Sequence, residues 1–187
     1  MISTGFKAKV VGAIGVFAFM AAAAMPAMAA GSVTQVIQCG GSNSLSASVA
    51  DMTLQQVNFS ASAQDSSGNL TLSAAEAGCA AQGWNVTIQA SDWAKDGGGT
   101  AIPASAFALT QVSNPSYVSG QQIDANNGPK LVNTLGVLSQ SRKVLQANAQ
   151  YGVGSYAQVL GVKLTIPAVT LPGTYKTTVT TTITTGP

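Results

Sequence analysis

The clearest pattern of apolar and polar positions lies at the C-terminal end of the chain, in residues 162–187. Residues 175–184 alternate strictly and are rich in threonine and other residues that favour strands. A period of two predicts a β-strand with one buried and one exposed face. Residues 162–166 alternate as well, and a turn at Pro172 and Gly173 follows them, so we expect a closing hairpin of two antiparallel strands. Its buried face would carry Tyr175, Val179 and Ile183, and its exposed face Lys176, Thr178 and Thr180.

A second alternating stretch spans residues 84–93, in which Trp84, Val86, Ile88 and Ala90 would share one face. Weaker patterns predict the remaining elements. We expect strands at 33–38, 45–50, 52–64, 107–112, 131–138, 143–149 and 157–166, a turn at 65–69, a short helical turn within 74–81 and a surface loop over 114–129. No stretch is typical of an amphipathic helix. The predicted fold class is therefore all-β, a single-domain antiparallel β-sandwich of about nine or ten strands.

The N-terminal segment has the pattern of a secretory signal peptide. Lys7 and Lys9 precede an uncharged apolar run over residues 10–24, and Ala27 and Ala29 form an Ala-x-Ala cleavage pattern. The alternative is a membrane anchor, but the run is shorter than the ~20 residues that a spanning helix needs. We therefore expect a signal peptide at residues 1–29 and a mature domain at residues 30–187. The mature chain would be secreted to the cell surface, with no membrane span of its own.

Composition narrows the classes of partner. Cleavage removes two of the eight basic residues, which leaves six against six acidic residues and a net charge of zero. A neutral chain does not favour nucleic acid or an anionic membrane as partner. Charged residues make up 7% of the sequence, against about 25% in ordinary globular domains. Such a composition is typical of surface-layer, fibre and adhesion domains.

The side chains that carry chemistry are few. Cys39 and Cys79 are the two cysteines of the chain, and in an exported protein they favour a disulfide bond over free thiols. The sequence has no histidine, which excludes a Ser-His-Asp triad. A carboxylate pair such as Asp92 and Asp96 is the alternative, for glycoside hydrolysis, but both lie in turn contexts that favour a structural role. We therefore expect no enzyme activity, no cofactor and no metal site.

Ordered short motifs resemble those of the WxL domain, a surface domain of Gram-positive bacteria. Residues 65–68 (DSSG) and then 83–86 (GWNV) stand where that family has an Asp-x-x-Gly turn followed by Gly-Trp-x-Val/Leu. Residues 173–175 (GTY) and the terminal Pro187 match its C-terminal end, while residues 181–183 (TTI) occupy the place of the second Trp-x-Leu. The resemblance implies non-covalent attachment to the cell wall, with peptidoglycan as ligand. Its candidate wall-binding or core residues are Trp84, Val86, Trp93, Tyr175 and Ile183.

Two functional hypotheses follow. The first is a secreted, non-catalytic cell-surface protein that associates with a cell-wall glycan or with other envelope proteins. The second is a pilin-like structural subunit that assembles by strand exchange, with the polar residues 30–38 as the donated strand, so oligomerisation is left open. For Trp84 we favour a core position over direct ligand contact, because its alternating strand would direct it inward.

Overall fold

The computed structural model describes residue 35, residues 44–78 and residues 81–187. The described chain is all-β and falls in the compact unit Gln38–Pro187, apart from residue 35. No described helix is long and apolar enough to cross a membrane. The elements are β1 (Ser44–Val49), β2 (Gln64–Ala77), β3 (Trp84–Ala90), β4 (Ala94–Lys95), the 3₁₀ turn η1 (Ala104–Ala106), β5 (Phe107–Val112), β6 (Ser116–Gly120), β7 (Lys130–Leu131), β8 (Gly136–Val137), β9 (Arg142–Ala147), β10 (Gly154–Ile166), β11 (Tyr175–Lys176) and β12 (Val179–Thr185).

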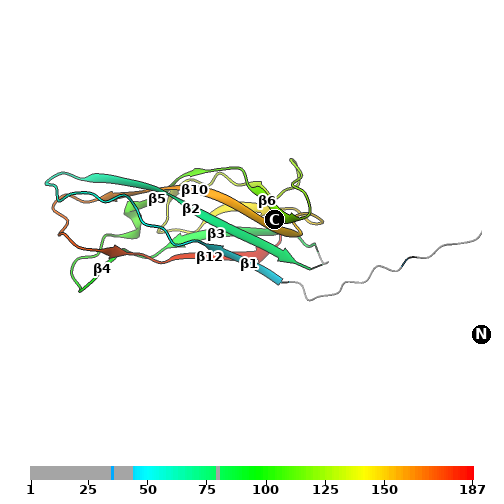
Figure 1. The fold of residues 1–187 in the computed structure, drawn as a ribbon, viewed down its shortest axis with the longest axis horizontal. Coiled ribbons are helices and arrows are strands. Elements are labelled where there is room, and N and C mark those ends of the chain that lie inside the picture. Colours follow the sequence, from blue (N-terminus) through cyan, green and yellow to red (C-terminus); the bar gives the residue numbers. More distant parts are fainter. Residues whose placement is uncertain (1–34, 36–43, 79–80) are drawn as a thin grey trace, which may run out of the picture. The chain divides into compact units, whose positions relative to one another are not determined.

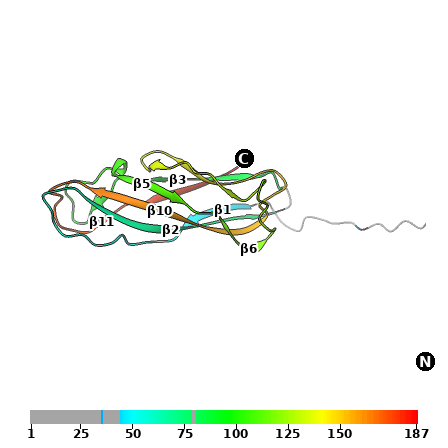
Figure 2. The same ribbon diagram turned by 90° about the horizontal axis from the view of Figure 1, so that it is seen from above.

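Two antiparallel sheets pack together (Figure 1). The first has the order β1-β2-β10-β5-β8, and its central pair β2 and β10 runs in register from Glu76 opposite Gly154 to Gln64 opposite Ile166. The other edge of β10 pairs with β6 along its first half and with β5 along its second half. Figure 2 shows β10 between β2 and β5. The second sheet has the order β12-β3-β9-β7, and β4 pairs separately with β11.

The core lies between the inward faces of these sheets. β3 contributes Trp84, Val86 and Ile88, all fully buried, as the alternation over residues 84–90 predicted. β2 and β10 face them with alternate apolar residues, among them Leu70, Leu72, Tyr156, Leu160, Val162 and Leu164. The all-β class and the packing of antiparallel sheets are therefore confirmed.

The expected C-terminal hairpin is wrong. β10 ends at Ile166 within the first sheet, whereas β12 pairs with β3 in the second sheet. Residues 167–178 cross from one sheet to the other instead of turning back on the same sheet. The alternation itself is confirmed, because Val179 and Ile183 pack against the core while Thr180 is exposed. Alternation reports which face is buried, but it does not report the hydrogen-bonding partner.

Two local predictions around β2 are also wrong. Residues 65–69 lie inside β2 rather than in a turn, and residues 74–77 continue this strand rather than forming a helical turn. Gly68 explains the first error: a Cβ atom here would collide with Cε of Met52. The glycine thus marks a close approach of another segment to a strand. Pairing with β1 and β10 on both edges outweighs the helical propensity of the alanines.

Residues 52–64 were expected as a strand, but residues 50–63 form no strand and join β1 to β2 as an extended segment, which we call the strap. The expected loop 114–129 contains β6, and the expected strand 131–138 is divided into β7 and β8. The strands predicted at 45–50, 107–112, 143–149 and 157–166 match β1, β5, β9 and β10 within a few residues. The signal peptide, the strand at 33–38 (except Gln35) and both cysteines lie outside the described residues, so those expectations stay predictions.

Candidate functional site

The structure divides the five candidate residues into two groups. Trp84 and Val86 are fully buried in the core, and Ile183 on β12 is in register with Val86 and packs against the core from the edge strand. Trp93 and Tyr175 instead line a cavity of about 1060 Å³. The sequence motif therefore does not form one site.

Trp84 has the surroundings of a core residue. Its indole Nε1 donates a hydrogen bond to the carbonyl oxygen of Gly152 at 3.0 Å. Its ring lies 6.2 Å from that of Tyr156, which belongs to the opposite sheet. The apolar part of the side chain is buried in the core, and its one polar group is hydrogen-bonded to the backbone. Trp84 has no surface left for a ligand, in agreement with the preference for a core position.

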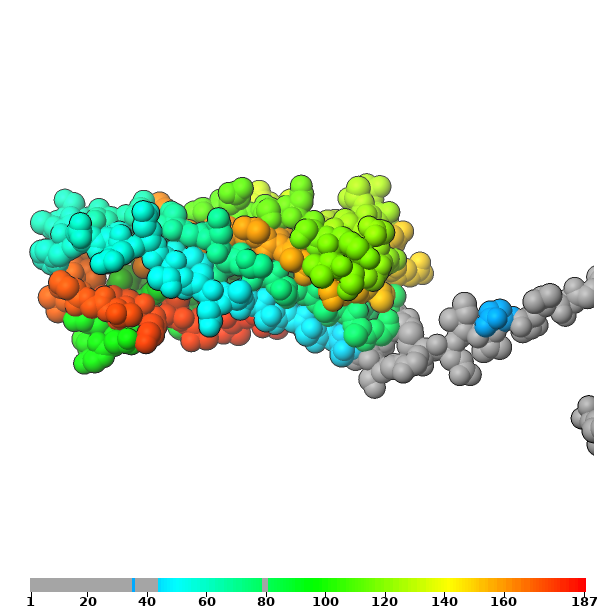
Figure 3. Space-filling view, viewed as in Figure 1, coloured from blue at the N-terminus to red at the C-terminus, as the bar shows by residue number. Residues whose placement is uncertain are grey.

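The cavity is built from segments of both sheets and the strap. Its walls include the inward side chains of β2, β5 and β10, the strap, and residues 170–179. Figure 3 shows the strap in cyan above the orange-red segment that contains β11, with a recess between them. Protein interiors rarely leave voids larger than a water molecule, and small-molecule sites occupy roughly 300–1,000 Å³. A cavity of this volume is therefore of ligand size.

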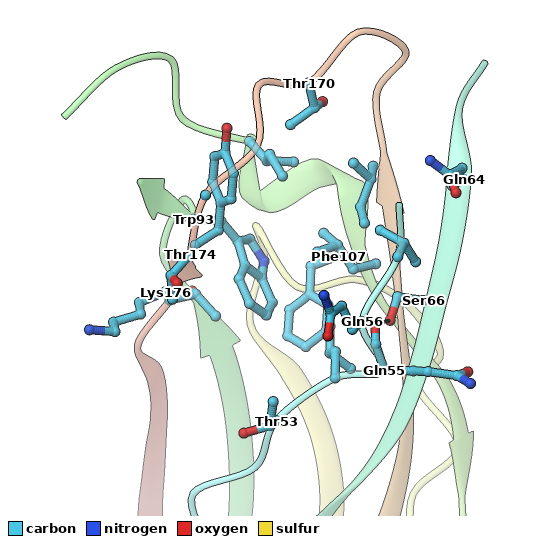
Figure 4. Close-up of a pocket in the computed structure, with 18 of the residues that line it drawn as sticks. Thr53, Gln55, Gln56, Gln64, Ser66, Trp93, Phe107, Thr170, Thr174 and Lys176 are labelled. Atoms are coloured by element: carbon cyan, nitrogen blue, oxygen red, sulfur yellow. Dashed lines mark hydrogen bonds between the residues drawn. The ribbon is translucent and has the colours of Figure 1, made fainter. Parts of the chain in front are cut away.

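Trp93 is positioned by its backbone and by one aromatic neighbour. Its N–H donates to the carbonyl of Ile102 at 2.8 Å, and its own carbonyl accepts from Ile102 N–H at 3.1 Å. Its ring meets Phe107 edge-on, with centroids 5.1 Å apart and planes at 89°, a favoured aromatic geometry. The indole Nε1 is buried and has no hydrogen-bond partner among the described residues. Figure 4 shows Trp93 and Phe107 side by side in the cavity wall.

Tyr175 reaches the cavity because β11 pairs with β4, which sets Tyr175 opposite Lys95. Its hydroxyl donates to the carbonyl of Leu171 at 2.9 Å and so closes the turn before β11. The next residue, Lys176, points away from the cavity (Figure 4) and forms an exposed ion pair with Asp96 at 2.8 Å. The alternation along β11 thus places the aromatic ring inward and the charge outward.

The strap supplies a polar wall and is held to β2 by side chains. The buried Ser66 hydroxyl donates to the carbonyl of Gln55 at 2.7 Å, and Nε2 of Gln64 donates to the carbonyl of Asn58 at 2.7 Å. No backbone hydrogen bond joins residues 51–59 to β2 within the described part of the chain. Gln56 is an exposed residue that lines the cavity, and Figure 4 draws its side chain next to Phe107. The strap is therefore fastened at a few points rather than by a ladder.

The apolar side chains of the strap complete the edge of the sandwich. Met52 and Leu54 pack against the core and fill the space that Gly68 leaves empty on the inward face of β2. At the end of the strap, Ser60 accepts a hydrogen bond from Val169 N–H at 2.9 Å. Three large apolar residues of this region are exposed: Phe59 at 62%, Val169 at 63% and Leu171 at 58%. Phe59 and Leu171 line the cavity, so one part of its border is apolar.

Asp51 lines the cavity and is exposed, whereas two acidic residues close to Trp93 have structural partners. Asp92 Oδ1 accepts a hydrogen bond from Ala104 N–H at 2.7 Å, and Asp96 pairs with Lys176. At the C-terminal end of β10, hydrogen bonds from Thr165 and then Lys163 lower the pKa of Asp65. No group of three or more His, Cys, Asp or Glu residues suitable for a metal ion occurs within the residues described. The carboxylates therefore support turns and strand pairs.

Sequence reasoning found the aromatic part of the cavity but missed its polar part. Ser66 and Gln56 were assigned to a turn and to a strand. One feature of the sequence could have indicated the polar part. Gly68 occupies an inward position of β2 between Ser66 and Leu70, and a glycine inside a strand often marks a place where another segment packs closely. Comparisons of this chain with family models, with curated proteins and with solved structures gave no match.

Proposed function

We propose that the mature chain is a secreted, non-catalytic cell-surface protein that associates non-covalently with a cell-wall glycan, of which peptidoglycan is the implied example. The signal-peptide pattern and the short motifs of WxL type supply the compartment and the class of ligand. The observation that carries the proposal is the cavity, whose wall combines Trp93, Tyr175 and Phe107 with neutral amide and hydroxyl groups. A lining of aromatic side chains with a few polar groups is typical of small-molecule sites.

Co-sedimentation with purified peptidoglycan tests this function. Tyr175→Ala removes an aromatic ring from the cavity, and we expect it to reduce the fraction that sediments with the wall. Tyr117→Ala is the matched control, because Tyr117 lies on β6 outside the cavity and is 42% exposed. Its sedimentation should equal that of the unaltered protein. If neither the parent protein nor the control sediments with the wall, the proposed function is wrong.

A pilin-like subunit is the second candidate, and one observation favours it. Residues 72–77 of β2 pair with β1, but residues 64–70 have β10 as their one strand partner in the described structure. The strap contacts this half-strand through side chains but makes no backbone ladder with it in the described structure, so an added strand that displaced the strap could pair there. A subunit that assembles in this way would form ladders or filaments in native electrophoresis and electron microscopy, whereas a wall-binding domain would sediment with the wall as a monomer.

A further inference from the structure

Two loop segments form an apolar tip at the end of the sandwich where β2 begins and β10 ends (left end in Figure 1). We call residues 58–63 and 167–172 the tip. The two segments meet where Val169 N–H donates to the Ser60 carbonyl at 2.9 Å. Three large apolar side chains of the tip are largely exposed to solvent, namely those of Phe59, Val169 and Leu171. Exposed apolar patches of this kind mark interaction sites.

Val169 holds its place in the tip at a conformational cost. Its φ is +53°, in the left-handed region, and such a value is a genuine outlier for a β-branched residue. Glycine or asparagine would adopt this conformation more readily. The isopropyl group is exposed, so it gains no burial in the domain that would offset the strain. Strained residues of this kind cluster at functional sites, which indicates that the tip is shaped for contact with another surface.

The charges around the tip limit the kind of surface that it contacts. No charged residue occurs in residues 57–64 or in residues 166–175. The charges that flank these stretches along the chain form exposed ion pairs, Asp65 with Lys163 at 2.9 Å and Lys176 with Asp96 at 2.8 Å. Lys95, whose side chain lies close to Gly173, adds a cation at the border. An uncharged, apolar medium suits this composition better than a charged partner does.

Several polar groups of the tip are already paired within the chain. The Thr170 hydroxyl donates to the Pro167 carbonyl at 2.6 Å. The Tyr175 hydroxyl donates to the Leu171 carbonyl at 2.9 Å. Pro167 and Pro172 have no backbone N–H that needs a partner. Backbone groups that face water can pair with water, whereas groups that enter lipid must be satisfied internally, so these pairings favour a lipid surface.

The size of the tip favours lipid over a second copy of the chain. Three exposed side chains provide an apolar area on the order of a few hundred Å², whereas a stable protein interface buries about 800 Å² on each partner. Interfacial membrane binding has no such minimum, because its strength scales with the apolar area that is inserted. A second copy is therefore the less suitable occupant.

We propose that the tip inserts its apolar side chains into the interfacial region of a lipid bilayer. Phe59, Val169 and Leu171 enter the boundary between headgroups and acyl chains, where phenylalanine and leucine are typical anchors. Lys95 stays at the level of the headgroups, because a lysine stem extends its charge toward water. Binding therefore does not require anionic lipid. The inference goes beyond the wall association, and Val169 does not line the cavity, so the two contacts can be tested separately.

Vesicle flotation with the mature protein, residues 30–187, tests the inference. The probe is a vesicle of phosphatidylcholine without anionic lipid, and we expect the protein to float with it. Val169→Asn should weaken binding about tenfold, because it removes one apolar side chain from the lipid. Its melting temperature should be no lower than that of the parent protein, since asparagine adopts the left-handed region more readily.

Val118→Asn is the matched control. Val118 lies on β6, outside the tip, and is 61% exposed against 63% for Val169, so this variant should bind as the parent protein does. A parent protein that does not float, an equal loss in both variants, or binding that requires phosphatidylglycerol overturns the inference. A dimer in analytical ultracentrifugation that Val169→Asn abolishes, without flotation of the parent protein, would assign the tip to a second copy and overturn it as well.

Wall sedimentation separates this inference from the proposed function. Val169→Asn should sediment with purified peptidoglycan as the parent protein does, because Val169 lies outside the lining of the cavity. Flotation without wall sedimentation would retain the lipid contact and refute the wall association. Wall sedimentation without flotation would retain the wall association and refute the lipid contact.

Discussion

Replacement of Trp84 by alanine should be among the most destabilising single changes in this domain. The side chain is 0% exposed, and truncation of a buried tryptophan to alanine costs about 3–5 kcal/mol through lost burial and the cavity that remains. The change also leaves the carbonyl of Gly152 without its indole donor, which adds about 1–3 kcal/mol. The expected loss in the free energy of unfolding is therefore about 4–8 kcal/mol, against a total of about 5–15 kcal/mol for a typical domain.

Trp93→Ala is the matched comparison, since it makes the same chemical change at the other tryptophan. Trp93 is only partly buried, and its Nε1 has no partner to lose. We expect it to cost less than half as much as Trp84→Ala. Urea unfolding followed by circular dichroism measures both, and the Trp84 variant should lose most of its folded baseline. Equal costs for the two variants, or a Trp84 variant with the midpoint of the parent protein, would refute the assignment of Trp84 to the core.

Three further predictions concern other parts of the domain. Val179→Asp should prevent folding, because it places an unpaired carboxylate against the core, whereas Thr180→Asp on the exposed face should be tolerated; equal secreted yields and circular dichroism spectra would contradict the assignment of faces on β12. Burial raises the pKa of Glu76 in the folded protein. As the pH rises, the unfolded chain therefore loses this proton first, and the free energy of unfolding decreases above the unfolded pKa of ~4.3. Glu76→Gln should therefore be more stable than the parent protein at pH 7 and should lose this advantage near pH 4 in urea titrations, and the opposite trend would contradict the burial argument. Mass spectrometry of the non-reduced exported chain should show Cys39 joined to Cys79, and two alkylated thiols in native material would exclude that bond.

The alternation of β3 and of β12 was read correctly from the sequence. The all-β class and the inward faces of β3 and β12 follow from a period of two, which the backbone of a strand imposes locally. The same reasoning identified Trp93 and Tyr175 as candidates because of their place in ordered motifs. It did not separate them from Trp84 and Val86, since a motif records order along the chain and not distance in space.

Contacts between distant segments were decided by the tertiary structure alone. β10 and β12 look like the two halves of a hairpin, yet they belong to different sheets because residues 167–178 cross between them. Residues 52–64 alternate like a strand, but within the described residues the strap makes no backbone ladder with β2, and its side chains Met52 and Leu54 fill the space above Gly68 instead. The cavity exists only where the strap, β5 and β11 meet. Local periodicity carries no information about contacts between distant segments. Which strands pair depends on the summed packing and hydrogen bonding of segments far apart in the chain.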